Sequence, residues 1–360
     1  MAYKNETVTS IADLITKLDS WMSGTGMWTS NHLDTSTTAG TGGEWAMTHT
    51  GSTNIRFAAS WDAENAGVAL ALYQYSDQAY VIGDRPWGQD HDSGNGYGAT
   101  TTDTLIKTSR HVLLHAAPLQ YWAFEDDSYT HIVVQVSARQ YVHFGFGILL
   151  KYGDWTGGEY CYGQLNSLLP YSSGYAAGDS ISMLLDGHLN DAAGEGYTSG
   201  TELFAATIHA EGLPNQTANG MWMVSMGGKI TSSVQTTFGN DRQSNDGVSS
   251  DTARHMFIDG LRAGAPIENF VRASQGTDIS GFHAMWEIAP RYYDDSTGHV
   301  YGPMGRMPDV RGINMDLWEA GDEIIQGGDT WVVFPAQIKW QSGESQTTGN
   351  LGIAYKKVTT

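Results

Sequence analysis

The hydrophobic pattern near the N-terminus predicts one short helix. Its apolar positions recur at helical spacing and form a single stripe, made of Ile11, Leu14, Ile15, Leu18 and Met22. Ser10 is an N-cap residue of a preferred kind, and Asp13 follows it at the spacing of a capping box. Gly24 and Gly26 end the pattern. We therefore expect a helix of about three turns that covers a β core.

Beyond this helix the pattern changes to short runs typical of strands. Residues 45–48 and 54–60 flank a turn signal at 50–52 and predict a hairpin. Residues 68–72 alternate between large and small apolar side chains, as in a strand with one crowded face. Residues 83–102 contain five glycines without a sustained apolar pattern, which predicts a long loop.

The densest strand signal lies in residues 129–137 and 141–150, which a short loop at 138–140 joins into a hairpin. In the second arm, bulky residues alternate with glycine, in the order Phe144, Gly145, Phe146 and Gly147. One face of this strand therefore lacks side chains, and a backbone or an aromatic ring can approach it closely. We treat these four residues as a candidate interface, with a contact inside the core as the equal alternative.

The C-terminal part of the chain has a second clear hairpin. Residues 321–325 and 330–335 flank the pair Gly327 and Gly328, which permits the positive φ values of a tight turn. Residues 351–358 predict the last strand. The stretch between about 165 and 280 has only short apolar pieces among Ser, Gly, Asn and Asp, and it predicts irregular structure.

These patterns together predict a mainly β fold with sandwich-like antiparallel sheets, one short N-terminal helix and a loop-rich middle region. Residues 1–165 would form a β domain with the helix, 166–280 an irregular loop-rich region, and 281–360 a C-terminal β region that can belong to the same domain as 1–165. We expect the hairpin at 129–150 to form the central sheet. The hairpin at 323–334 would then pack with it or beside it.

The net charge of the chain limits the classes of partner that it can bind. The 360 residues include 39 acidic and 19 basic side chains, so the net charge is near −20. Such a surface repels phosphate, and we expect no nucleic-acid partner. Cys161 is the only cysteine, so an intrachain disulfide is excluded. The first residues lack the apolar run of a signal peptide, and no run of about 18 apolar residues predicts a membrane span.

A search for catalytic and metal-binding patterns yields weak candidates only. No nucleophile elbow, no His-Glu-x-x-His zinc motif and no phosphate-binding P-loop is present. Residues 90–96 resemble a Ca²⁺ loop, but the ligand register breaks at Gly94 and position twelve is Thr101. His131 and His143 lie on the predicted hairpin, where cross-strand pairing is plausible and paired structural histidines are favoured over metal ligation. We predict neither a metal site nor a cofactor.

Acidic residues are numerous enough that a glycosidase carboxylate pair remains an alternative. The candidates are Glu125, Asp126, Asp127, Glu159, Asp294 and Asp295. Such enzymes need two carboxyl groups about 5–9 Å apart, and sequence spacing does not establish that distance. We predict that the chain is not an enzyme and assign no catalytic residue.

Four stretches of the chain resemble structural proteins of tailed bacteriophages and prophages. They are residues 13–28, residues 118–147 with Pro-Leu-Gln-Tyr-Trp and His-Phe-Gly-Phe-Gly, residues 151–160, and residues 306–335 with Gly-Gly-Asp-Thr-Trp. This resemblance covers the first 165 residues and about the last 60. It implies a particle component assembled in the host cytoplasm, at a tail, neck, baseplate or capsid-surface position.

The sequence therefore predicts a virion structural protein that forms homo-oligomers and contacts other virion proteins. Absence of disulfides fits assembly in a reducing cytoplasm. A first alternative is a virion protein that binds a host glycan or receptor, with Trp87, Tyr97 and Trp155 on Gly-rich loops as stacking platforms. A glycan-degrading enzyme is the second and weaker alternative.

Overall fold

The chain folds into antiparallel β-sheets with one short helix in the part that the structure describes, as the sequence predicts. The computed structural model describes residues 2–35, 43–51, 56–62, 67–73, 106–113, 118–164, 204–211, 220–226, 254–259, 278–279, 282–283, 285–294, 299–315, 317–335 and 351–358. Residues 83–102, predicted to form a long loop, lie outside these ranges.

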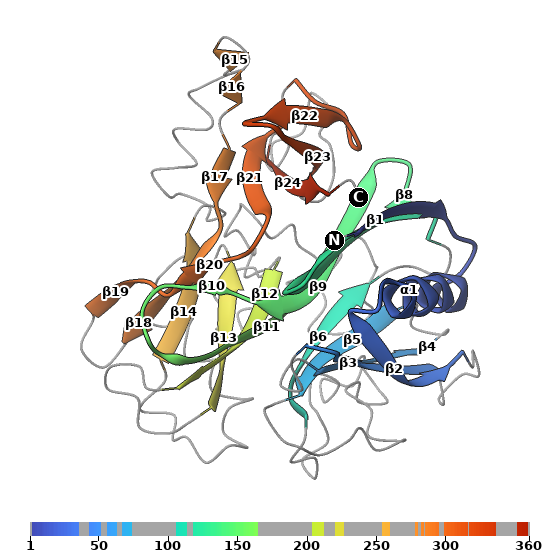
Figure 1. Ribbon diagram of the computed structural model, residues 1–360, viewed down its shortest axis with the longest axis horizontal. Coiled ribbons are helices and arrows are strands. Elements are labelled where there is room, and N and C mark those ends of the chain that lie inside the picture. The colour runs from blue at the N-terminus through green and yellow to red at the C-terminus, as the bar shows by residue number, and fades with distance from the viewer. Residues whose placement is uncertain are drawn as a thin grey trace, which may run out of the picture.

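A ten-stranded sheet runs through the middle of the molecule (Figure 1). In spatial order its strands are β1 (Ala2–Thr7), β7 (Gln120–Asp126), β8 (Tyr129–Ser137), β9 (Gln140–Ile148), β11 (Thr156–Gln164), β12 (Phe204–Glu211), β13 (Gly220–Met226), β14 (Arg254–Asp259), β18 (Ala289–Asp294) and β19 (His299–Pro303). Its neighbours pair antiparallel except β13 and β14, which are parallel. Three of its strands come from residues 166–280, so part of the region predicted to be irregular extends this central sheet.

Two five-stranded sheets accompany the central sheet. The N-terminal sheet contains β2 (Trp28–Asp34), β3 (Gly43–His49), β4 (Arg56–Asp62), β5 (Gly67–Tyr73) and β6 (Ile106–Leu113). The C-terminal sheet contains β17 (Met285–Glu287), β21 (Val310–Asn314), β24 (Leu351–Lys357), β23 (Asp329–Pro335) and β22 (Glu323–Gln326). Two small ribbons join β10 (Leu150–Lys151) to β20 (Gly305–Arg306) and β15 (Asp278–Ile279) to β16 (Phe282–His283).

The helix α1 (Ile11–Thr25) forms where the apolar stripe predicts it, and all five stripe residues are buried. Ser10 accepts a hydrogen bond from the Asp13 amide at 3.1 Å, and Gly26 ends the helix in the left-handed conformation with φ +78°. Gly24 lies inside the last turn instead of ending the helix. The predicted boundaries at Ser10 and Gly26 are confirmed.

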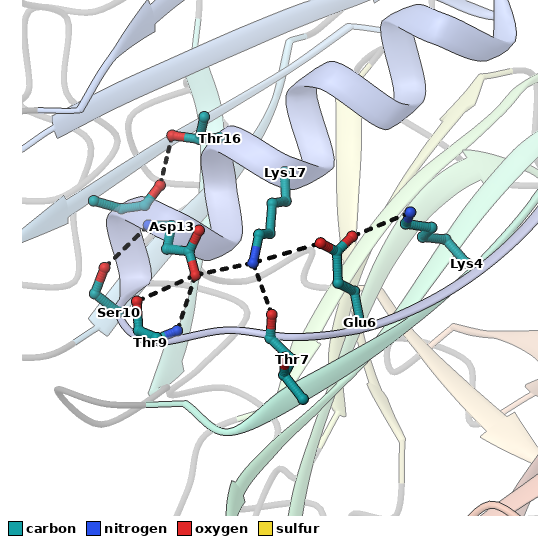
Figure 2. Close-up of polar contacts among 9 residues, drawn as sticks. Lys4, Glu6, Thr7, Thr9, Ser10, Asp13, Thr16 and Lys17 are labelled. Atoms are coloured by element: carbon teal, nitrogen blue, oxygen red, sulfur yellow. Dashed lines mark hydrogen bonds and ion pairs between the residues drawn. The ribbon is translucent and has the colours of Figure 1, made fainter.

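Lys17 fastens α1 to the edge strand β1 (Figure 2). Its ammonium group donates to the Thr7 carbonyl at 2.8 Å and to Asp13 Oδ2 at 3.2 Å. Glu6 lies 3.6 Å from the same ammonium and 3.1 Å from that of Lys4. Because these pairs are partly exposed, each stabilises the contact only weakly, but together they fix how the chain enters the helix.

The hairpin β8–β9 lies between two layers. One of its faces packs on α1 and on β2–β3 in a cluster whose largest members include Trp28, Trp45, Phe144 and Phe146. The opposite face meets the C-terminal sheet through Phe334 and Tyr355. In Figure 1 the C-terminal sheet lies above β8 and β9, and α1 with the N-terminal sheet lies below. The predicted central position of this hairpin is confirmed.

The other predicted hairpins also form. β3 pairs with β4, and β22 pairs with β23. In the second turn Gly327 and Gly328 have φ values of +64° and +88°, as a two-residue turn with two positive φ values requires. This hairpin packs through Phe334 on Trp122 of β7, at a ring distance of 4.9 Å.

Candidate interaction surfaces

The candidate interface at Phe144, Gly145, Phe146 and Gly147 lies inside the chain. Both phenylalanines are fully buried on the α1 side. A Cβ atom on Gly145 would lie 2.9 Å from the Tyr162 ring, and one on Gly147 would lie 2.7 Å from Tyr129 Cα. The glycines make room for neighbouring parts of the same chain, so the interface interpretation of this strand is corrected to a core contact.

Two buried histidines join the central sheet to the C-terminal part of the chain. His131 Nδ1 lies 2.9 Å from the Tyr162 hydroxyl, and its Nε2 lies 2.9 Å from the Pro308 carbonyl. His143 is held in the same way, at 2.8 Å from the Tyr355 hydroxyl and 3.0 Å from the Pro335 carbonyl. Since a carbonyl only accepts, each Nε2 carries the proton and each Nδ1 accepts from a tyrosine.

An imidazole whose Nδ1 accepts is neutral, and burial favours that form of both histidines. Burial lowers the pKa of His131 to about 3 and that of His143 to about 4. The strand register places His131 opposite Gly145 and His143 opposite Val133, so the two histidines are not cross-strand partners. Each instead bonds to segments more than 150 residues away, which sequence spacing does not show.

Of the carboxylates considered for catalysis, the structure describes the side chains of Glu125, Asp126, Asp127 and Glu159, and only the backbone of Asp294. Glu125 is fully buried beside Thr130, whose hydroxyl donates to Oε1 at 3.4 Å, and burial raises the pKa of Glu125 to about 7. Asp127 is exposed, and its amide bonds to the carboxylate of Asp126. Asp295 lies outside the described residues, as does the loop at 90–96. Among the described residues, no three His, Cys, Asp or Glu side chains form a group suited to a metal ion.

Of the three predicted stacking platforms, the structure describes only Trp155. Trp87 and Tyr97 lie outside the described residues. Trp155 is half-buried, and its indole N–H donates to the carbonyls of Tyr152 and Met304 at 3.2 and 3.0 Å. The Lys151 ammonium lies 5.3 Å from the centre of the ring. These contacts hold Trp155 as an anchor of its loop and put a cation over one of its faces.

The exposed aromatic ring of this loop is Tyr152, which the sequence analysis did not single out. Tyr152 and Leu150 are 43% and 41% exposed. The loop is held in place because Leu150 pairs with Arg306 and the Tyr152 amide donates to the Met304 carbonyl at 2.8 Å. An aromatic residue directly before Gly153, which adopts φ +84°, was the available signal for a ring at the tip of a turn.

Charged residues surround Tyr152. Its hydroxyl donates to Glu287 Oε2 at 3.4 Å. The same carboxylate accepts a short hydrogen bond from Arg306 and lies 3.7 Å from Arg311. Leu150, Lys151, Tyr152, Asp154, Glu287, Arg306 and Arg311 together are called the Tyr152 surface below. It combines exposed apolar area with ordered charges, as interfaces with proteins or polar ligands do.

Two further exposed apolar residues lie on the C-terminal hairpin and in the loop before it. Ile325 is 74% exposed and Leu317 is 62% exposed. Adjacent residues of a strand point to opposite faces, so Ile324 enters the core while Ile325 faces outward. We call Glu323, Ile325 and Asp329 of the hairpin β22–β23 the Ile325 surface. The two adjacent isoleucines were a signal in the sequence that one of them is exposed.

Comparisons with known proteins leave the family of the chain open. No protein-family model matches it, and no curated protein matches it either. No helix among the described residues is long and apolar enough to cross a membrane.

Proposed function

We propose that the protein is a structural component of a tailed-bacteriophage virion, a non-enzymatic unit that associates with itself and with other particle proteins. The observation that carries this proposal is a set of hydrogen bonds between the stretches that resemble such proteins. Tyr129 donates to Asp309 at 2.9 Å, His131 bonds to Pro308, and His143 bonds to Pro335. The stretches from both ends of the chain thus form one continuous body.

The use of polar groups supports a structural role. The buried histidines, which are common catalytic bases elsewhere, bond to carbonyls and tyrosines between layers and are held neutral. A general base needs a proton acceptor within reach of a substrate and a pKa near the working pH. Neither is available at His131 or His143. These side chains therefore stabilise the packing of the layers.

Exposed apolar residues on ordered loops support the association part of the proposal. The Tyr152 surface and the Ile325 surface both present large apolar side chains on segments that backbone hydrogen bonds hold in place. Ordered apolar residues lose little entropy on binding, which favours an interface. Particle components in the proposed class assemble through such contacts in the host cytoplasm.

The test is the mass of the purified protein in solution, followed by its location in particles by cryo-electron microscopy. We expect an oligomer of defined size and a fixed copy number at one position in the particle. A stable monomer that is absent from purified particles would contradict the proposal.

Binding of a host glycan is the second candidate function, and exposure of Tyr152 favours it. A sugar ring could stack on the phenol beside the ordered Glu287 and Arg306 side chains. This candidate predicts saturable binding of the wild-type protein to host polysaccharide and its loss in Tyr152→Ala. The matched control is Leu119→Ala, which removes an exposed apolar side chain elsewhere.

A further inference from the structure

The strand β1 is one edge of the ten-stranded sheet, and no described strand pairs with its outer side. In Figure 1 it is the dark-blue strand above α1. Asn5 and Thr7 are exposed on it. An open edge presents unpaired backbone N–H and C=O groups, so a strand of another chain can pair with it. The far edge strand, β19, is less suited, because it ends at Pro303, which has no backbone N–H.

The hydrogen bonds around Thr7 show which backbone groups face the open side of β1. The Val8 amide donates at 3.0 Å to the carbonyl of the residue before β7, so it points toward β7. The C=O of the same peptide bond, that of Thr7, points the other way and accepts from the Lys17 ammonium at 2.8 Å. Because these directions alternate along a strand, the amides and carbonyls of Tyr3 and Asn5 face the open side as well. The Thr7 oxygen has a second lone pair for a further bond.

Lys4 and Glu6 give this edge one cation and one anion at a fixed spacing. They are two residues apart in the strand, so their side chains lie on the same face. Their charged groups are 3.1 Å apart, and both side chains are partly exposed (Figure 2). An approaching strand therefore meets a basic position followed by an acidic one.

The charged residues next to these two are themselves paired. On the face of α1, Lys17 lies 3.2 Å from Asp13. On the opposite face, the Lys357 ammonium lies over the ring of Tyr3 and donates to Glu323 at 2.7 Å. Neither face adds an unpaired charge among the described side chains at this edge. The charge pattern that a partner strand meets is thus the one that Lys4 and Glu6 make.

This pattern matches itself in one register. In an antiparallel pair centred on Asn5, Lys4 of each strand lies opposite Glu6 of the other, at a position without backbone hydrogen bonds, where side chains are closest. Tyr3 then lies opposite Thr7, and the outward backbone groups of both strands can bond. A register centred on Lys4 or on Glu6 would instead place that residue opposite its own copy. The charges therefore select one register and one partner, a second copy of the strand.

We propose that β1 of one copy pairs with β1 of a second copy, antiparallel about a two-fold axis at Asn5, and that this joins the two ten-stranded sheets into one. The inference rests on the proposed function, since it specifies how the structural unit associates with itself. The same strand is used on both sides, so the contact closes as a dimer. Its affinity should fall as salt rises, because the Lys4–Glu6 contacts are partly exposed.

The test reverses each charge in the full chain. Lys4→Glu places carboxylates opposite each other, and Glu6→Lys places ammonium groups opposite each other. We expect each variant to weaken dimerisation by about tenfold in sedimentation velocity at low salt. Arg139→Glu, at an exposed position in the turn between β8 and β9, changes the net charge as Lys4→Glu does and should dimerise like the wild type. Near-ultraviolet circular dichroism should be unchanged in all three variants.

Two combinations restore opposite charges across the two-fold axis. The double variant Lys4→Glu, Glu6→Lys exchanges the two charges within one chain and should dimerise like the wild type. An equimolar mixture of the two single variants should form heterodimers, because the acidic strand of one lies opposite the basic strand of the other. If both combinations stayed as weak as the single variants, the register at Asn5 would be overturned.

Hydrogen exchange measured residue by residue locates the contact. The amides of Tyr3, Asn5 and Thr7 should exchange more slowly at concentrations where the dimer forms, whereas those of Lys4 and Glu6, which face β7, should be protected at all concentrations. An oligomeric wild type without this change would overturn the contact and leave the proposed function standing. A wild type that is monomeric at high concentration would overturn the contact, and its absence from purified particles would overturn the proposed function as well.

Discussion

The two faces of the hairpin β8–β9 are stabilised in different ways. The face toward α1 is apolar, and its side chains are Ile132, Val134, Val142, Phe144 and Phe146. The face toward the C-terminal sheet carries Tyr129, His131 and His143, which bond to Asp309, Pro308 and Pro335. Both faces are buried. The first has a hydrogen bond from the Trp28 indole to the Thr130 hydroxyl at 3.1 Å, whereas three such bonds join the second to the C-terminal part of the chain.

This contrast shows how one strand pair can serve two kinds of packing. The apolar face is non-directional, so side chains of similar volume can replace one another there at small cost. The polar face is directional, because a buried donor or acceptor that loses its partner keeps its full desolvation cost. The polar face therefore selects the C-terminal sheet as its partner, while the apolar face supplies most of the buried area.

The largest expected effect is on the apolar face. Phe144→Ala should reduce the free energy of unfolding by about 3–5 kcal/mol, because it removes a fully buried ring and leaves a cavity. Urea denaturation measures this change. Leu119→Ala, at an exposed position, should change it by less than about 0.5 kcal/mol. Equal effects of the two substitutions would show that the face is not packed as described.

Acidification should weaken the packing of the polar face. The folded pKa values of His131 and His143 lie below the usual 6.5, so their contribution is complete above pH 6.5 and is lost as the pH falls toward 4. Each histidine lowers the free energy of unfolding by about 1.4 kcal/mol for every pH unit of acidification in this range. Glu125 acts oppositely: its pKa is raised from 4.5 to about 7, so its contribution is complete below pH 4.5 and is lost as the pH rises through 7.

Between pH 6.5 and 4.5 these three groups together should therefore lower the free energy of unfolding by about 1.4 kcal/mol per pH unit, and His49, whose pKa burial also lowers, acts in the same direction. Glu125→Gln removes the opposing group and should steepen the loss to about 2.7 kcal/mol per pH unit. Denaturation midpoints of both proteins across this pH range provide the measurement. A wild-type stability that rises on acidification would contradict the neutral, buried state of the histidines.

The close approach at Gly145 gives a smaller effect. Gly145→Ala should cost about 1–3 kcal/mol, because the new Cβ would lie 2.6 Å from the Thr130 carbonyl oxygen. Gly24→Ala is the matched control. Its Cβ would meet nothing within 4 Å inside the helix, so that substitution should stabilise the protein by about 0.5–1 kcal/mol. Thermal unfolding of the pair should show opposite shifts, and shifts of the same sign would count against the crowding at Gly145.

The smallest expected effect concerns the N-cap of α1, the helix that packs on the apolar face. Ser10→Ala should cost about 1 kcal/mol, since the Asp13 amide loses its N-cap acceptor. Thr16→Ala, at an exposed position in the same helix, is the control and should change stability by less than about 0.5 kcal/mol. Chemical denaturation distinguishes them, and an unchanged Ser10→Ala protein would mean that the cap contributes nothing.

Local elements were predictable because their signals are local. The caps at Ser10 and Gly26 and the turn at Gly327–Gly328 depend on backbone conformations that a few neighbouring residues determine. The alternation of Phe144 to Gly147 likewise showed that one face of β9 lacks side chains. What approaches that face was left open by the sequence, and Tyr162 and Tyr129 occupy it.

The candidate surfaces were harder to predict for a physical reason. The local pattern places Tyr152 at a turn and shows that one of the two adjacent isoleucines faces outward, but which side chain stays exposed depends on which sheets cover the neighbouring strands. Trp155 stood out as an aromatic residue in a turn, yet backbone carbonyls and Lys151 hold it as an anchor. The exposed ring is three residues earlier.

The sequence by itself determined the mainly β class, the helix, the hairpins and the acidic charge, since periodicity and turn chemistry act over a few residues. Tertiary structure decided which faces meet and which side chains stay exposed. His131 and His143 illustrate the difference: their strand was evident from the pattern, but their partners lie 177 and 192 residues away in the sequence. Contacts over such separations form only when the layers pack. Neighbouring residues in the sequence therefore carry no pattern that identifies these partners.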